Sequence, residues 1–204
     1  MDRLACMRVT VCGAGALGSN LTETLARQGF QNLRVIDHDR VEEHNVGTQT
    51  YGLCDVGAFK VEVLRSHLFR LTEVEIDARR IELSERSVRK CLRESDLVID
   101  AFDNSASREL VQKHCREKGI ECLHIGLSAD YGEIIWNDNY LVPADVDGDV
   151  CDYPLARNLV TLTVSVAAEI LIRWISNDTR DDVSVTLNDF AVRPMEQSVT
   201  RGGS

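Results

Sequence analysis

Two short patterns near the start of the chain could do chemistry on a nucleotide. Residues 13–18 read GAGALG, which fits G-x-G-x-x-G, between an apolar run at 8–12 and a helical pattern. Glycines in this context let backbone N–H groups approach phosphate oxygens at a helix N-terminus. Asp37 ends the next apolar run, where a carboxylate can accept hydrogen bonds from ribose hydroxyls. Together they predict a nucleotide site, and at this level NAD, FAD and ATP are equally allowed.

A second set of polar residues extends the pattern. The stretch that starts at Asp37 reads DHDRVEEHNVGTQ, and Lys60 follows in a later helical segment. Residues 100–104 read DAFDN at the end of another apolar run. With these motifs, residues 8–175 resemble the ThiF/MoeB/HesA family of ubiquitin-activating-like adenylyltransferases, whose pattern joins D-x-D-x-V-x-x-x-N, a lysine and D-x-x-D-N.

The resemblance implies an enzyme that uses ATP and Mg²⁺ to adenylate the C-terminal carboxylate of a ubiquitin-like or sulfur-carrier protein. It assigns Mg²⁺ to Asp103, a hard oxygen ligand, and places Lys60 on the phosphates as a point charge. Asp37 would bind the ribose. The nucleotide-binding residues implied are Gly13, Gly15, Ala16, Gly18, Asp37, Asp39, Asn45, Gln49, Lys60, Asp103 and Asn104.

Several of these residues also have a purely structural interpretation. Asp103 could cap the helix that follows it. Lys60, taken alone, could be a solvated surface lysine. Asp39 and Asn45 could simply order their loop. The sequence leaves these alternatives open.

Three features of the family are missing. Thr48 stands where the family has an arginine, and the first strand begins too early for the N-terminal helix that often donates another arginine. The chain also has no C-x-x-C pair, so we expect no zinc. Loss of one charged transition-state contact costs roughly 100- to 1000-fold in rate. Efficient adenylation therefore needs a substitute, such as Arg108 or an arginine from a partner.

Cys151 is a candidate nucleophile, alongside Asp103 and Lys60 as candidate catalytic residues. It lies in the acidic loop 137–154, roughly where relatives carry a segment that can hold a thiol for transfer. The neighbouring Asp149 and Asp152 would raise the pKa of this thiol and lower its reactivity.

The elements that must position these residues alternate between strands and helices. Apolar runs predict strands at 8–12, 33–36, 74–81, 97–101, 120–127, 133–136 and 183–187, and helical spacing predicts helices at 16–28, 55–70, 84–94, 105–118 and 155–176. Asp55 is the predicted N-cap of the second helix. This order predicts an α/β fold with a doubly wound, Rossmann-like, mostly parallel sheet and antiparallel C-terminal strands. We expect one domain over 1–194 and a disordered tail over 195–204.

Composition narrows the partners and the compartment. A net charge of −10 argues against nucleic acid and anionic membranes as partners, because both are polyanions. Residues 1–7 hold two charges and no long apolar core, so we expect no signal peptide and a cytoplasmic protein. The apolar segment 155–176 contains Glu169 and Arg173, which favours a buried helix at a homodimer interface over a membrane span.

Three functional hypotheses follow. Intact Asp37, Lys60 and Asp103 favour an adenylating enzyme. Thr48 and the short N-terminus favour a scaffold of the same family that binds nucleotide and a partner without catalysis. The third, an NAD-dependent oxidoreductase, has no supporting His–acid or Tyr–Lys pair and would bind NAD without Mg²⁺.

Overall fold

The computed structural model describes residues 2–143 and 156–195, and one sheet runs through this part of the chain. The strands are β1 (Arg8–Cys12), β2 (Asn32–Ile36), β3 (Asp77–Arg79), β4 (Leu97–Asp100), β5 (Glu121–Ser128), β6 (Tyr131–Trp136), β7 (Val183–Thr186) and β8 (Ala191–Pro194). The α-helices are α1 (Asp2–Cys6), α2 (Ala16–Arg27), α3 (Lys60–Thr72), α4 (Val88–Cys91), α5 (Ser105–Lys118) and α6 (Ala156–Asn177). Two 3-10 helices, η1 (Glu43–Gly47) and η2 (Leu53–Asp55), lie between β2 and α3.

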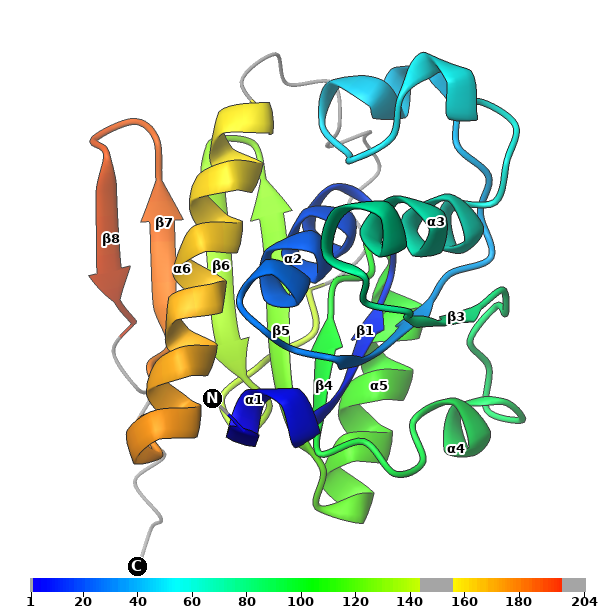
Figure 1. Cartoon of the computed structure of the whole chain (residues 1–204). Coiled ribbons are helices and arrows are strands. Elements are labelled where there is room, and N and C mark those ends of the chain that lie inside the picture. The colour runs from blue at the N-terminus through cyan, green and yellow to red at the C-terminus, as the bar shows by residue number, and fades with distance from the viewer. Residues whose placement is uncertain (1, 144–155, 196–204) are drawn as a thin grey trace, which may run out of the picture.

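The sheet has the order β3-β2-β1-β4-β5-β6-β7-β8 (Figure 1). Strands β1 to β5 pair in parallel, and β6, β7 and β8 pair in antiparallel fashion at the C-terminal end. This arrangement confirms the predicted α/β class, with its mostly parallel sheet and antiparallel C-terminal strands. The strand order reverses between β1 and β4, which is where open parallel sheets bind ligands.

Helices cover both faces of the sheet because the strand residues alternate between two apolar clusters. Val11 and Ile99 pack in the larger cluster with α2, α3 and α6, whereas Cys12 and Val98 pack in the smaller one with α4 and α5. A side-chain period of two sends neighbours in a strand to opposite faces. Buried apolar residues on both faces explain why these strands read as continuous apolar runs.

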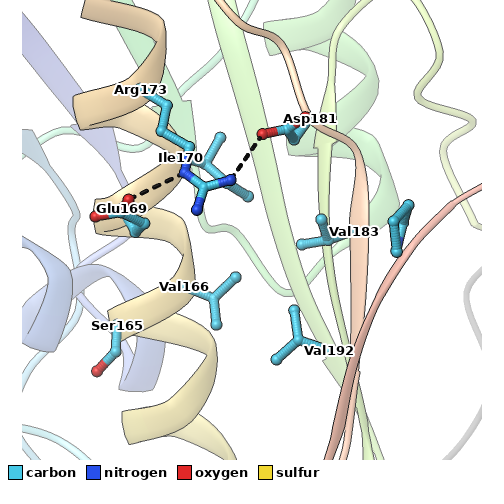
Figure 2. A pocket seen from close by; sticks show the side chains of 9 residues that line it. Ser165, Val166, Glu169, Ile170, Arg173, Asp181, Val183 and Val192 are labelled. Atoms are coloured by element: carbon cyan, nitrogen blue, oxygen red, sulfur yellow. Dashed lines mark hydrogen bonds and ion pairs between the residues drawn. The ribbon is translucent and has the colours of Figure 1, made fainter. Parts of the chain in front are cut away.

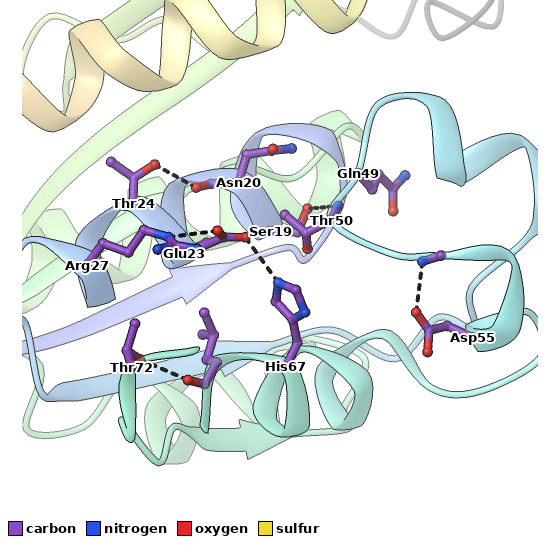
Figure 3. Close-up of polar contacts among 12 residues, drawn as sticks. Ser19, Asn20, Glu23, Thr24, Arg27, Gln49, Thr50, Asp55, His67 and Thr72 are labelled. Carbon is purple, nitrogen blue, oxygen red and sulfur yellow. Dashed lines mark hydrogen bonds and ion pairs between the residues drawn. The ribbon is translucent and has the colours of Figure 1, made fainter. Parts of the chain in front are cut away.

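On the larger face, polar side chains join the helices to each other. Glu23 of α2 accepts from Arg27, one turn further on, and contacts His67 of α3 (Figure 3). The long helix α6 packs on the core through Leu159, Ala167 and Leu171. By length and composition α6 could cross a membrane, and 50% of its most apolar window is buried inside the molecule. Its packing agrees with the predicted buried helix.

Several predicted boundaries are wrong, for local reasons. The helix predicted to start after Asp55 begins at Lys60 instead, because Gly57 adopts φ 90°, which no helix accommodates. Asp55 ends η2, where its side chain accepts from the Gly52 N–H at 2.8 Å. The chain also does not open with a strand, since α1 precedes β1.

Three further elements differ from the prediction. The predicted strand 74–81 shortens to β3, which pairs with only three residues of β2. The predicted helix 84–94 reduces to the single turn α4. Strand β8, which forms the edge of the sheet beside β7, was not predicted, because Arg193 and Pro194 do not read as a strand.

Candidate functional site

The glycine turn joins β1 to α2 at the carboxyl end of the sheet. Gly13 has φ 95°, and a Cβ there would lie 2.9 Å from the Ala101 carbonyl oxygen. A Cβ on Gly18 would lie 1.9 Å from the Gly13 oxygen, so both positions require glycine. Gly15 has no neighbour within 4 Å of its would-be Cβ, and no side chain caps α2 there. The first amides of α2 are thus available to an anion.

Asp37 holds this turn from the neighbouring strand. One oxygen of its carboxylate accepts from the Ala14 N–H at 2.7 Å, and the other accepts from the Asp39 N–H at 2.7 Å. The Tyr51 hydroxyl donates to the Ala14 carbonyl at 2.8 Å. Asp37 is only 6% exposed, and burial raises its pKa, although the Ala14 hydrogen bond and the Lys60 charge oppose the rise. The observed contacts of Asp37 order the turn, and the predicted ribose contact stays a prediction.

Lys60 lies at the start of α3 and points inward. Its side chain is 10% exposed, and its Nζ lies 3.0 Å from Asp39 Oδ2. The alternative of a solvated surface lysine is therefore wrong. Asp37, His38 and Asp39 also bring ligand atoms within 4.8 Å of one another, but both His38 and Asp39 are exposed. The Lys60 ammonium already balances the charge of Asp39.

The segment between Asp39 and Lys60 carries two more of the predicted nucleotide-binding residues, Asn45 and Gln49. Asn45 is buried, and its Oδ1 accepts from the Glu42 N–H at 2.9 Å, so it orders its loop, as one alternative held. Gln49 is 8% exposed, and within the described residues its Oε1 has no hydrogen-bond partner. Figure 3 shows Gln49 and Thr50 beside α2, where the Thr50 N–H donates to Ser19 Oγ at 3.4 Å. A buried amide oxygen without a partner is suited to a ligand donor.

Asp103 lies just beyond β4 and is exposed. The contact found for its carboxylate within the described residues is a weak one from Asn104 Nδ2 at 3.5 Å. Asn104, rather than Asp103, caps α5, because its Oδ1 accepts from the Ser107 N–H at 2.9 Å. The capping alternative for Asp103 is therefore wrong. The tight contact between Gly13 and Ala101 places this carboxylate close to the glycine turn.

Residues 1–200 of the chain match the ThiF family. The chain belongs to the ThiF family. The matched range includes the glycine turn, both acidic strand ends and Lys60. Family membership confirms the resemblance that those motifs predicted.

Related proteins match part of this ThiF-family chain. The adenylyltransferase and sulfurtransferase MOCS3 of Aedes aegypti is 38% identical over 109 residues, covering 52% of the chain and 25% of that protein. The SAMP-activating enzyme E1 of Haloferax volcanii is 35% identical over 124 residues, covering 60% and 46%. The sulfur carrier protein adenylyltransferase of Thermus thermophilus is 37% identical over 112 residues, covering 54% and 41%. The matches thus span less than half the length of each relative.

Solved structures show the same fold. The crystal structure of E. coli MccB with ATP superposes with a TM-score of 0.82 at 16% identity, covering 96% of the chain and 65% of MccB. MccB with AMPCPP and selenomethionine MccA gives the same TM-score of 0.82, covering 100% and 67%. At such low identity the likeness establishes the fold of the ThiF-family chain and no more.

The structure adds a buried polar network that the sequence analysis missed. His124 Nδ1 lies 2.8 Å from Asp100 Oδ2, and its Nε2 lies 2.8 Å from Asn137 Oδ1. Tyr140 stacks on the imidazole at 3.8 Å between centroids, and its hydroxyl accepts from Arg108 at 2.7 Å. These residues come from separate elements, so no local motif signals them. The network holds Asp100, the last residue of β4, three residues before Asp103.

Arg108 belongs to that network, and its side chain is held in the interior. Arg108 is 7% exposed, and its guanidinium donates to the Tyr140 hydroxyl and to the Ile125 carbonyl at 2.9 Å. The substitute that the sequence analysis named is thus committed elsewhere. Arg157, which the sequence analysis did not consider, lies against Thr48 instead.

A hollow of about 450 Å³ lies elsewhere, between α6 and the β7–β8 edge of this ThiF-family fold (Figure 2). Its walls are largely apolar, with Arg173 bridging Glu169 and Asp181 at the rim. It contains none of the predicted site residues. Cys151, the candidate nucleophile, lies outside the described residues.

Proposed function

We propose that the chain is an ATP- and Mg²⁺-dependent adenylyltransferase that activates the C-terminal carboxylate of a ubiquitin-like or sulfur-carrier protein, or of a related peptide. Family membership supports the reaction class. The names of the relatives refer to adenylyl transfer, to a SAMP and to a sulfur carrier. Two of the similar MccB structures contain ATP or AMPCPP, the latter with MccA.

One observation carries the proposal. A Cβ on Gly13 would lie 2.9 Å from the Ala101 oxygen and 3.3 Å from the Phe102 nitrogen, so the glycine turn lies against the start of the DAFDN segment. Asp103, an exposed carboxylate, is the second residue after Ala101 in that segment. A dehydrogenase needs the turn and the ribose acid, but it has no use for this second carboxylate.

The residues present fit ATP and Mg²⁺. The uncapped start of α2 and the open space at Gly15 suit a phosphate chain. Asp103 offers carboxylate oxygens, which are the ligands that Mg²⁺ prefers in proteins. When bound, Mg²⁺ neutralises part of the phosphate charge. Lys60 brings a second cation, already oriented by Asp39.

These residues suggest a division of roles in the reaction. A carboxylate oxygen of the substrate attacks the α-phosphorus of ATP, and the bond from that phosphorus to its bridging oxygen breaks to release pyrophosphate. The amides of α2 hold the phosphates, and Lys60 stabilises the charge that develops on the leaving group. Asp37 keeps the turn in place through Ala14. Gln49, with its unpartnered oxygen, is available to a nucleotide donor.

We further propose that the chain acts in the cytoplasm as a homodimer. The support for the homodimer is that Leu162, Val166 and Ile172 of α6 are only partly buried, although they lie against the core. Apolar side chains on a helix are stabilised when a partner covers them. Sedimentation of the full chain tests this part separately from catalysis.

The main test is calorimetry of ATP, and of NAD as a comparison, with and without Mg²⁺. We expect the wild type to bind ATP in a Mg²⁺-dependent manner and Asp103→Ala to bind it more weakly. Pyrophosphate exchange with carrier peptides that end in Gly-Gly then tests adenylation. Binding of NAD without Mg²⁺, and not of ATP, would refute the proposal. ATP binding without exchange on any carrier would favour the scaffold, the function that Thr48 supports.

A further inference from the structure

Arg157 lies in the first turn of α6 and reaches across to the loop that carries Thr48. Its Nη1 donates to the Thr48 carbonyl at 3.2 Å and, more weakly, to the Gln49 carbonyl at 3.5 Å. These residues are 109 and 108 positions apart in the chain. Figure 1 shows that α6 and α2 both start toward the same end of the sheet, at the top of the view. The contact therefore brings a cation from the C-terminal part of the chain to the end of the sheet where the nucleotide site is predicted.

The same carbonyl places Arg157 near the phosphate end of α2. Asn20 Nδ2 donates to the Ala16 carbonyl at 2.7 Å and to the Thr48 carbonyl at 2.9 Å. Ala16 is the first residue of α2, so Thr48 lies about one helical turn from the uncapped amides. The Arg157 guanidinium shares the Thr48 oxygen with Asn20. It is thus anchored beside the position where the family carries its arginine.

The charge of Arg157 is free to serve an anion. Its side chain is exposed, and within residues 2–143 and 156–195 no carboxylate pairs with it and its Nε and Nη2 have no partner. Lys60, by contrast, is paired with Asp39. A guanidinium held by one nitrogen still presents donors that match phosphate oxygens. The chain has a net charge of −10, yet within the described residues this arginine has no carboxylate partner.

We propose that Arg157 supplies the phosphate-binding cation that Thr48 no longer provides, by contacting the β- and γ-phosphates that leave as pyrophosphate. The inference rests on the proposed function and concerns the same site. It explains how a chain with a threonine at this position keeps a cationic contact to the leaving group. Arg108 is excluded from the role, because Tyr140 and Ile125 hold it in the interior.

The test compares ATP and AMP binding by calorimetry with Mg²⁺, using the wild type, Arg157→Ala and the double variant Arg157→Ala/Thr48→Arg. AMP lacks the phosphates in question. We expect Arg157→Ala to weaken ATP binding roughly 10- to 100-fold, the range of a charge-assisted hydrogen bond, and to leave AMP binding unchanged. Thr48→Arg should restore ATP binding in the double variant, because it returns the cation by another route.

A matched control separates charge from loop support. Asn20→Ala removes the other donor to the Thr48 carbonyl without removing a cation. Equal losses of ATP binding in Asn20→Ala and Arg157→Ala, with no rescue by Thr48→Arg, would show that Arg157 only supports the loop and would overturn the inference. Thermal melts of all variants confirm that each is folded.

The outcomes also separate this inference from the proposed function. Wild-type binding of ATP with an unchanged affinity in Arg157→Ala would overturn the role of Arg157 and leave the function standing. Absence of ATP binding in the wild type itself would refute the function, and the role of Arg157 with it.

Discussion

Asp37 and Asp103 each come just after a buried parallel strand, yet their surroundings differ. Asp37 is 6% exposed, and its carboxylate accepts hydrogen bonds from two backbone N–H groups. The Asp103 carboxylate is exposed and, within the described residues, contacts only the neighbouring Asn104 at 3.5 Å. One acid is tied into the fold, and the other is left open. Their positions in the sequence pattern do not reveal this difference.

The difference shows how the site divides stability from chemistry. Burial of Asp37 raises its pKa, and the carboxylate holds the glycine turn through the Ala14 N–H. Asp100, buried against His124, fixes the end of β4 in a similar way. Asp103 therefore follows a strand end that other residues hold in place, and its own carboxylate is not needed to hold it. A rigid support with an open ligand is what a metal-dependent site requires.

The largest expected effect is a loss of adenylation activity when the exposed carboxylate of Asp103 is removed. Asp103→Ala should lower the rate of pyrophosphate exchange roughly 100- to 1000-fold, because it removes a group that stabilises charge in the transition state. The free energy of unfolding should change by less than about 0.5 kcal/mol, as for other exposed residues. Glu109→Ala, an exposed carboxylate on α5, is the control and should retain activity. Equal exchange rates in both variants would exclude a catalytic role for Asp103.

The second effect is on the stability of the glycine turn, which Asp37 holds through Ala14. Gly18→Ala places a Cβ 1.9 Å from the Gly13 carbonyl oxygen, so the turn must move. We expect a loss of about 3 kcal/mol in the free energy of unfolding, the upper range for overpacking. Gly15→Ala meets no atom within 4 Å and should leave stability nearly unchanged while crowding a bound phosphate. Urea denaturation of the two variants measures the contrast, and equal stabilities would contradict it.

The third effect is on stability at the buried acid. Asp37→Ala leaves the buried Ala14 N–H without its acceptor, which costs about 1–3 kcal/mol. Urea denaturation should show this loss, whereas Asp103→Ala should not. If Asp37→Ala unfolded at the wild-type urea concentration, the turn would not depend on this carboxylate.

The sequence predicts Asp103 and the glycine turn better than it predicts the distant residues that contact this region of the fold. Strands β1, β2 and β4 fall within one residue of their predicted bounds, because a strand buried on both faces reads as a continuous apolar run. The start of α3 was missed because Gly57 has a positive φ of 90°, and the spacing of apolar residues carries no information on that angle. Residues 13–18, Asp37 and Asp103 belong to local motifs. Arg157 and His124 act on residues far away in the chain, so only the fold brings them into view.

The smallest expected effect is a pH dependence at Asp37. Burial raises its pKa above the ordinary value of 3.8, so the native state holds this proton more tightly than the unfolded state does. As pH rises from 3.8 through the raised pKa, the unfolded state ionises first and the contribution of Asp37 to stability falls. The Ala14 hydrogen bond and the Lys60 charge oppose burial and keep the fall small.

Asp37→Asn lacks this titration but retains an oxygen acceptor. The difference in free energy of unfolding, wild type minus Asp37→Asn, should therefore decrease as pH increases across that window and level off above it. Urea denaturation of both proteins at several pH values measures the difference, and the other carboxylates cancel because both chains share them. An increase with pH would mean that the hydrogen bonds from Ala14 and Asp39 outweigh burial. Asp37 would then resemble a conventional paired carboxylate, and its contrast with Asp103 would lie in exposure alone.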